Sequence, residues 1–240
     1  MYSLETLSEI EFELSSHCNS KCPQCPRYDM LGRVQKDLNV THLDLDIIQK
    51  LPLRKMKNLK IVRFCGNFGD PLMHPGLDDI ISFFQNQHIY VSTNASLRSK
   101  GWWQKFGTAK WQFIVFRHNE HQLNEAKQIS QEIGFKRIDF IYSDRFDTDN
   151  KWKVYDDENY LYDLEKSSHQ TTLKKSLNAP DGEKYWKSLL KNRGAITCIW
   201  SEMKKLYIHS DGIVYPCCML GSIESGRNLE KLMLKKLVKD

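Results

Sequence analysis

The residues with the most distinctive chemistry in this chain are its seven cysteines, six of which fall into two groups. The first group lies near the start of the sequence and comprises Cys18, Cys22 and Cys25. The second lies near the end and comprises Cys198, Cys217 and Cys218. Clustered thiolates are typical ligands of soft metal ions and iron–sulfur clusters. An odd number of cysteines, in a chain whose start has no secretory pattern, argues against a disulfide framework.

The spacing of the first group, C-x3-C-x2-C, decides which metal centre it suits. Three thiolates from one short loop can bind three corners of a cubane cluster and leave the fourth iron with an exchangeable position. A structural zinc site needs four closed ligands, and His17 offers a fourth one. A ferredoxin-type electron carrier needs a fourth cysteine close to the other three. Zinc therefore stays an open alternative for this loop considered alone.

Strands and helices alternate through the first 143 residues. Strands are expected over 10–14, 59–64, 88–92, 111–116 and 138–142, and helices over 43–53, 76–87, 100–106 and 122–133. This alternation is typical of βαβ units that form a parallel sheet, either open or closed into a barrel. Ligands bind at the carboxyl ends of such strands. Cys18, Cys65 and Thr93 each follow an expected strand, so we expect them at one rim, with Cys65 buried.

The rest of the chain follows other patterns. Residues 144–182 are polar and predict a solvated excursion with a short helix, although a substrate-contacting loop is an alternative. Residues 205–209 and 213–215 flank Ser-Asp-Gly and predict a hairpin. An apolar stripe over 229–237 has helical spacing and predicts a docking helix.

Four motifs, in this order, resemble those of radical S-adenosylmethionine (SAM) enzymes. Residues 16–27, SHCNSKCPQCPR, resemble the CxxxCxxC cluster loop of that family. Residues 66–75, GNFGDPLMHP, are similar to its strand-two motif, usually GGEPLLHP, and residues 92–94, STN, resemble its strand-three STNG element. The spacing Cys198-x13-Gly212-x4-Cys217 resembles the first half of the SPASM cysteine pattern, as retained in the shorter twitch variant.

The resemblance implies an α/β fold: a partial (β/α)6 barrel of the radical SAM type with a small C-terminal hairpin-plus-helix module. Residues 1–143 would form the radical SAM core. Residues 144–193 would be a polar excursion and helix that completes or caps it. Residues 194–240 would form a SPASM/twitch-like auxiliary iron–sulfur module.

The resemblance also implies roles for individual residues. Cys18, Cys22 and Cys25 would bind a [4Fe-4S] cluster whose open iron binds SAM. The residues implied in SAM binding are Gln24 near the adenine, Phe68, Gly69, Asp70 and Pro71 beside the methionyl amine, and Thr93 and Asn94, with Asn94 near the sulfonium. Three positions depart from the family pattern: Gln24 replaces a bulky residue, Asp70 replaces Glu, and residues 116–119, FRHN, replace a Ser-x-Asp. Ribose contacts would then fall to Arg117 or Asn119.

The second cysteine group would bind one auxiliary iron–sulfur cluster, of uncertain type, through Cys198, Cys217 and Cys218. A fourth ligand other than cysteine or an open site would complete it. The alternative is a set of hairpin cysteines that binds no metal.

The resemblance implies a radical SAM oxidoreductase. It would cleave SAM to methionine and a 5′-deoxyadenosyl radical, which abstracts a hydrogen atom from a peptide or protein side chain or from a small metabolite. A reductase or flavodoxin-type protein would donate the electron. The alternative is a non-catalytic iron–sulfur protein that transfers electrons or senses redox state.

Charge and hydropathy limit the kinds of partner that the chain is expected to bind. The net charge is +5 and no basic stripe stands out, so no feature favours a nucleic-acid partner. No run approaches the roughly 18 apolar residues of a spanning helix, and the start has no basic region followed by an apolar stretch. We therefore expect no membrane association and a cytoplasmic location.

Overall fold

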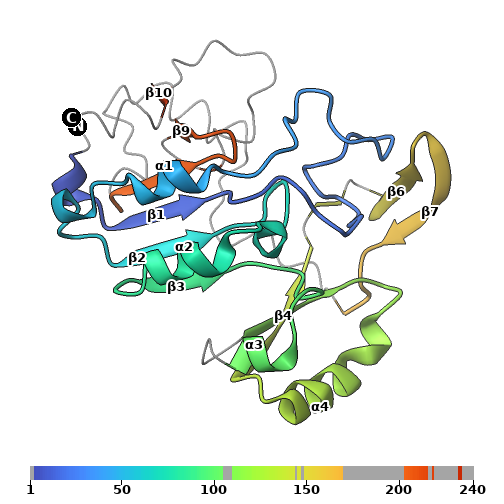
Figure 1. Ribbon diagram of the computed structural model, residues 1–240. Helices are drawn as coiled ribbons and strands as arrows, with labels where there is room; N and C mark the ends of the chain where they lie inside the picture. The colour runs from blue at the N-terminus through green and yellow to red at the C-terminus, as the bar shows by residue number, and fades with distance from the viewer. Residues whose placement is uncertain are drawn as a thin grey trace, which may run out of the picture. The chain divides into compact units, whose positions relative to one another are not determined.

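A computed structural model describes residues 3–104, 110–143, 145–146, 149–169, 203–215, 218 and 232–233 of the chain. The described residues fall into two compact units (Figure 1). Unit 1 comprises residues 1–29, 34–98 and 197–240, and unit 2 comprises residues 30–33 and 99–196. The division after residues 143 and 193 that the sequence predicts stays a prediction. The functional role of each expected segment stays a prediction.

Unit 1 is built on a sheet with the strand order β10-β9-β8-β1-β2-β3. Its parallel strands are β1 (Glu9–Phe12), β2 (Ile61–Phe64), β3 (His88–Val91) and β8 (Lys205–Ile208). The expected strands near residues 10–14, 59–64 and 88–92 are thus confirmed. In register, Phe12 lies between Phe64 and Ile208, and Phe64 lies beside Val91. The carboxyl ends of all four strands therefore meet at one edge of the sheet.

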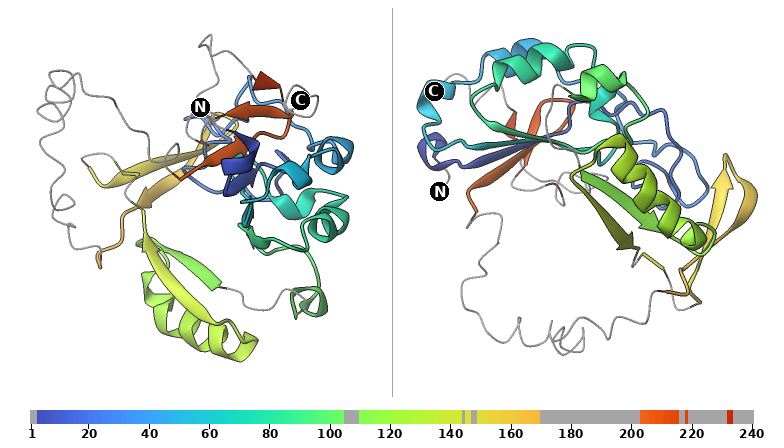
Figure 2. Two further views of the ribbon diagram at one scale, coloured as in Figure 1. Left: turned by 90° about the vertical axis from the view of Figure 1, so that its left-hand side faces the viewer. Right: turned by 90° about the horizontal axis from the view of Figure 1, so that it is seen from below.

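Two short helices cover one face of this sheet (Figure 2). They are α1 (Leu45–Gln49), capped by Asp44, and α2 (Leu77–Phe83), which follows Pro75-Gly76. Both fall inside the longer ranges that the sequence predicts, and Pro52 keeps α1 from continuing. Phe84, directly after α2, packs against Phe12 at a ring-centroid distance of 5.6 Å and against Phe64 at 6.4 Å. This aromatic contact joins α2 to β1 and β2.

The predicted hairpin near the end of the chain is confirmed as β8 and β9 (Ile213–Tyr215). Gly212 turns it with a φ of 81°, a conformation that favours glycine. The hairpin is part of the unit 1 sheet, because β8 pairs in parallel with β1. β10 (Leu232–Met233) pairs antiparallel with β9. At these two residues the predicted docking helix over 229–237 is wrong, because they form strand bonds; the rest of that range lies outside the described residues.

Unit 2 contains the parallel pair β4 (Lys110–Val115) and β5 (Arg137–Tyr142), connected by α4 (Leu123–Ile133). Figure 2 shows α4 along one face of this pair. Gly134 ends α4 in the left-handed conformation that favours glycine, directly after the helix expected over 122–133. The helix α3 (Lys100–Gln104) belongs to the same unit and begins where the sequence predicts one.

The described part of the polar segment 144–182 contains strands where the sequence predicts a solvated excursion with a short helix. β6 (Lys151–Asp156) and β7 (Asn159–Glu165) form an antiparallel hairpin. Its two-residue turn is Asp157-Glu158, with φ values of 47° and 72°. Tight hairpin turns with two positive φ angles normally use Asn-Gly or Asp-Gly. The hairpin over 151–165 was not predicted because Asp-Glu gives no such signal; residues 170–182 lie outside the described residues.

The structure confirms a mixed α/β fold with parallel strands. The described residues form one six-stranded sheet and two two-stranded sheets, and β3 and β4 are not joined by strand bonds. A continuous six-stranded (β/α)6 barrel wall therefore stays a prediction. Among the described residues, no helix has the length and apolar character needed to cross a bilayer.

Candidate cofactor-binding site

The candidate site is built from the loops that follow β1, β2 and β3 at the carboxyl edge of the unit 1 sheet. The loop after β1 carries the cysteines of the first group, the loop after β2 carries residues 65–74, and the loop after β3 carries Thr93 and Asn94. Parallel pairing in register brings the three loops to the same edge. The structure therefore brings three of the four recognised motifs together, as the sequence predicts.

Gly69 allows the loop after β2 to lie directly against the chain that precedes Cys18. A Cβ atom at this position would stand 2.1 Å from the carbonyl oxygen of Ser15 and 2.6 Å from that of His17. The next residue donates its backbone N–H to the His17 carbonyl at 2.8 Å. Position 69 therefore requires glycine, because the two backbone segments approach each other too closely for a side chain.

Asp70 joins the loop after β2 to the loop after β3. Its side chain is 2% exposed and accepts hydrogen bonds from the Asn94 N–H and the Thr93 hydroxyl, each at 2.8 Å. It also accepts the Leu72 N–H at 2.8 Å, which caps the 3-10 turn Pro71–Met73. The carboxylate of Asp70 thus orders both loops. Its sequence-predicted role beside a methionyl amine stays a prediction.

Asn94 connects the loop after β3 to the cysteine loop. Its side-chain amide donates to Asn19 Oδ1 at 2.9 Å and to Ser20 Oγ at 2.8 Å. Asn19 in turn donates to Ser96 Oγ at 2.8 Å. These bonds place Thr93 and Asn94 beside the segment between Cys18 and Cys22.

A buried carboxylate, Glu13, holds the loop after β2, and no sequence motif indicates this role. It accepts the N–H groups of three successive residues at 3.0 to 3.1 Å: Asn67, Phe68 and Gly69. The hydroxyl of Tyr207 on β8 donates to it at 3.1 Å and the thiol of Cys65 at 3.3 Å. Five donors therefore converge on one side chain that is 0% exposed.

Burial controls the ionisation of this cluster. It raises the pKa of Glu13, and the hydrogen bonds from the Phe68 N–H and the Cys65 thiol oppose that shift. Burial, followed by the neighbouring Glu13 carboxyl, holds the pKa values of Cys65 and Tyr207 well above their usual ranges. Cys65 and Tyr207 therefore remain protonated and can donate. Cys65 is 6% exposed, so its expected burial is confirmed.

The alternating pattern of residues 10–14 hides the role of Glu13. Ile10, Phe12 and Leu14 alternate with Glu11 and Glu13, which in a half-exposed strand would place the glutamates in water. β1 is instead an inner strand between β2 and β8, and parallel sheets are commonly buried on both faces. A glutamate on such a strand, a few residues before a cysteine loop, must find hydrogen-bond donors.

The three cysteines of the loop have unequal exposure. Cys22 is exposed, Cys18 and Cys25 are half-buried, and all three thiols are free. Burial raises the pKa values of Cys22 and Cys25, and the charge of Cys18 raises both further. Three neighbouring thiols suit iron–sulfur chemistry in their donor type. Within the described ranges, no three His, Cys, Asp or Glu side chains are arranged to hold a single metal ion, so ligation by these cysteines stays a prediction.

The remaining residues of the predicted SAM site lie around the same loops. Gln24 is half-buried and adopts a φ of 63°, which is uncommon for a residue other than glycine. Pro71 begins the 3-10 turn after Asp70 and is buried. Phe68 is also buried, and its ring packs edge-on to His209 at 5.6 Å between centroids. Its side chain therefore faces His209, directly after β8, whereas its backbone N–H bonds to Glu13 and its carbonyl to Arg27.

Of the second cysteine group, only Cys218 lies within the described residues. It is half-buried and packs against the buried cluster of Cys65, Tyr207, Ile213 and Tyr215. Cys198 and Cys217 lie outside the described residues. An auxiliary cluster at these cysteines stays a prediction.

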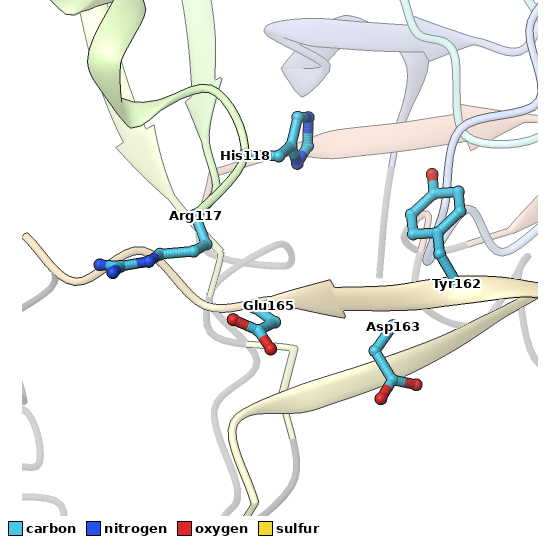
Figure 3. Close-up of a pocket in the computed structure, with 5 residues that line it drawn as sticks. All are labelled: Arg117, His118, Tyr162, Asp163 and Glu165. Carbon is cyan, nitrogen blue, oxygen red and sulfur yellow. The ribbon is translucent and has the colours of Figure 1, made fainter.

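Unit 2 has a separate open pocket with a volume of about 400 Å³ (Figure 3). It is lined by Arg117, His118, Tyr162, Asp163 and Glu165. Arg117 pairs with Glu120 at 2.9 Å. Asn119 accepts the Phe116 N–H at 2.8 Å and donates to the Ile114 carbonyl at 3.0 Å, so its side chain closes the turn after β4. Ribose binding by Arg117 or Asn119 stays a prediction.

Comparison with known proteins identifies the fold. No protein-family model matches the chain, and no curated protein matches its sequence. A solved structure of Streptococcus suis SuiB bound to precursor peptide SuiA has a TM-score of 0.50 at 14% identity, covering 95% of this chain and 62% of SuiB. Histidine-tagged anSMEcpe with bound AdoMet has a TM-score of 0.48 at 15% identity, covering 96% and 75%. BtrN in complex with AdoMet and 2-DOIA has a TM-score of 0.40 at 16% identity, covering 98% and 80%.

These three proteins are radical SAM enzymes, and the likeness to SuiB shows that this chain has a fold of the radical SAM superfamily. The expected α/β fold of the radical SAM type is therefore confirmed, while the partial (β/α)6 barrel stays a prediction. The presence of a SPASM or twitch module stays a prediction.

Proposed function

We propose that this protein is a radical SAM enzyme that binds a [4Fe-4S] cluster through Cys18, Cys22 and Cys25. When bound, the cluster supplies one electron for the reductive cleavage of SAM to methionine and a 5′-deoxyadenosyl radical, which abstracts a hydrogen atom from the substrate. The substrate is a peptide or protein side chain or a small metabolite. A reductase or flavodoxin-type protein is the proposed electron donor, and the cytoplasm is the proposed location.

The observation that carries this proposal is the bonding between three loops. The Asp70 N–H donates to the His17 carbonyl, the Asn94 N–H donates to the Asp70 carboxylate, and the Asn94 amide donates to Ser20 Oγ. Each of the loops after β1, β2 and β3 is therefore hydrogen-bonded to the other two. The three motifs that resemble those of radical SAM enzymes are thus parts of one bonded structure. Chance resemblances in unrelated loops would not be expected to converge in this way.

The chain's own residues would have distinct tasks in this function. The cysteine loop provides three sulfur ligands, and Asn94 fixes its position through Asn19 and Ser20. Gln24 would contact the adenine, and the segment from Phe68 to Pro71 with Thr93 would border the bound SAM. Glu13 holds that segment by its N–H groups, which leaves the segment little freedom to move when the ligand binds.

The primary experiment measures iron and SAM cleavage after anaerobic reconstitution. Cys22→Ala should lower the iron content and abolish 5′-deoxyadenosine formation with dithionite, because the cluster would lose one of its three protein ligands. Cys65→Ala is the matched control, since it removes a thiol outside the loop and should leave the iron content unchanged. Wild-type protein that holds iron but forms no 5′-deoxyadenosine would contradict the proposed enzyme and favour an electron-transfer or redox-sensing role.

The auxiliary module is a second part of the proposal. Cys217→Ala should leave uncoupled SAM cleavage intact and reduce substrate turnover if Cys198, Cys217 and Cys218 bind an auxiliary cluster. Loss of uncoupled cleavage in the same variant would indicate a structural role for this cysteine group. Candidate peptides and small metabolites, tested for deuterium transfer into 5′-deoxyadenosine, would decide the substrate class.

A further inference from the structure

Arg27 is a buried cation directly after the cysteine loop. Its side chain is 7% exposed, whereas Lys21 within the loop is exposed. One terminal nitrogen, Nη1, donates to the carbonyl of Phe68 at 2.9 Å and also to that of Ser16. The guanidinium therefore joins the chain before Cys18 to the loop after β2.

Both bonds use the same nitrogen, and the guanidinium carbon also lies 5.9 Å from the centre of the Tyr28 ring. The Nε atom is buried and has no hydrogen-bond partner within the described part of the chain. No carboxylate of the described residues pairs with this guanidinium, whereas the arginines that do form ion pairs in the two units are partly exposed. A buried charge without a counter-charge is expensive, so an anion is expected nearby in the functional state.

The cysteine sulfurs of the adjacent loop are the candidates for that anion. The backbone N–H of Arg27 bonds to the Cys25 thiol, so the residue that carries this guanidinium also contacts the cysteine loop. Sulfurs that bind iron do so as thiolates, which adds negative charge to this side of the loop. A residue needed only to tie two carbonyls together would not need a permanent charge.

We propose that Arg27 is the buried counter-charge of the anionic centre that forms when the cysteine loop binds iron, and that it makes this centre easier to reduce. The inference rests on the proposed iron–sulfur function of the loop. A positive charge in a site with little water interacts strongly with a neighbouring anion, and the net charge around a cluster is one determinant of its reduction potential. Arg27 acts through the cluster and is a positioning residue.

The test compares three single variants of the full chain after anaerobic reconstitution. Arg27→Gln removes the buried charge, Lys21→Gln removes an exposed charge from the same loop, and Arg27→Lys keeps the charge while it changes the geometry of the two carbonyl bonds. Iron content and the midpoint potential of the cluster, from a redox titration followed by electron paramagnetic resonance, are measured for each. The potential of Arg27→Gln should be clearly more negative than that of wild type, Lys21→Gln should change little, and Arg27→Lys should lie close to wild type.

Each outcome decides the inference. Equal potentials in iron-loaded Arg27→Gln and Lys21→Gln would overturn it and leave the proposed function in place. If Arg27→Gln does not fold or load iron, the Arg27→Lys variant decides between the two roles. Iron loading with a potential near that of wild type would support the counter-charge. Failure of Arg27→Lys to fold or load iron would overturn the inference and show that Arg27 only holds the two backbone carbonyls in place. Wild-type protein that takes up no iron would remove the proposed function and this inference together.

Discussion

At the carboxyl edge of the unit 1 sheet, Glu13 and Asp70 are buried and each accepts several hydrogen bonds, whereas the carboxylates of the β6–β7 hairpin in unit 2 face water. Glu158 on that hairpin pairs with Arg33 at 2.6 Å, but the two side chains are 62% and 36% exposed. Exposed pairs contribute little because water competes for both charges. Loss of a buried acceptor, in contrast, leaves its donors unsatisfied. Substitutions should therefore be costly at the unit 1 edge and tolerated on the unit 2 hairpin.

The largest effect is expected for Gly69→Ala. The added Cβ would overlap the Ser15 carbonyl, so either the loop after β2 or the chain before Cys18 must move. The free energy of unfolding should fall by about 4 kcal/mol in urea denaturation. Gly101→Ala in α3 is the matched control, because its Cβ would meet nothing closer than Ser99 Oγ at 4.0 Å. That variant should be neutral or slightly more stable, and an equal loss in both variants would contradict the close approach at Gly69.

Glu13→Gln should have the next largest effect. The amide nitrogen would face donors that need an acceptor, so several of the five hydrogen bonds would be lost. We expect a loss of about 2 to 3 kcal/mol in the free energy of unfolding. Glu158→Gln, which makes the same change on the exposed hairpin, should cost less than about 0.5 kcal/mol. Similar losses at the two positions would remove the contrast between the units.

Substitution of Glu120 tests whether a well-bonded carboxylate in unit 2 makes the stability of the protein depend on pH. The hydroxyl of Ser168 and then that of Ser167 donate to it, and these bonds with the charge of Arg117 lower its pKa to about 2 from 4.5. Because the folded pKa lies below the unfolded one, the stabilising contribution is present above about pH 4.5 and is lost as the pH falls towards 2. The difference in Tm between wild type and Glu120→Gln should therefore be largest near neutral pH and shrink below pH 4.5. A difference that stays constant from neutral pH down to about pH 2 would contradict the assigned pKa.

The smallest effect is expected for Lys151→Ala on β6. Its ammonium group lies 3.0 Å from Glu165 and 3.8 Å from Asp163, and the lysine side chain is 47% exposed. Tm should change little, and the change should vanish at high salt because the charges are screened. A large, salt-independent loss would indicate that the hairpin depends on this lysine for packing.

The sequence predicted the strands and motifs whose signals are local. Alternation in residues 10–14 and the Asp-Gly turn before β9 each depend on a few neighbouring residues, and the structure contains the expected strand and hairpin. The hairpin β6–β7 was missed because its turn, Asp157-Glu158, lacks the usual glycine. The role of Glu13 was missed because it depends on Tyr207, which is 194 residues away along the chain. Contacts of that kind follow from sheet topology, which local patterns do not specify.

The pairing of β1 with β8 has a consequence for how the protein is made. β1 ends at Phe12 and its parallel partner begins at Lys205, so a ribosome must complete most of the chain before this pair can form. Until then, one edge of β1 has no strand partner, and the Glu13 carboxylate lacks the hydrogen bond from the Tyr207 hydroxyl. Strand pairs between such distant segments form late and slow folding. Nascent chains released before residue 205 should therefore aggregate or be degraded more readily than chains that include the last hairpin.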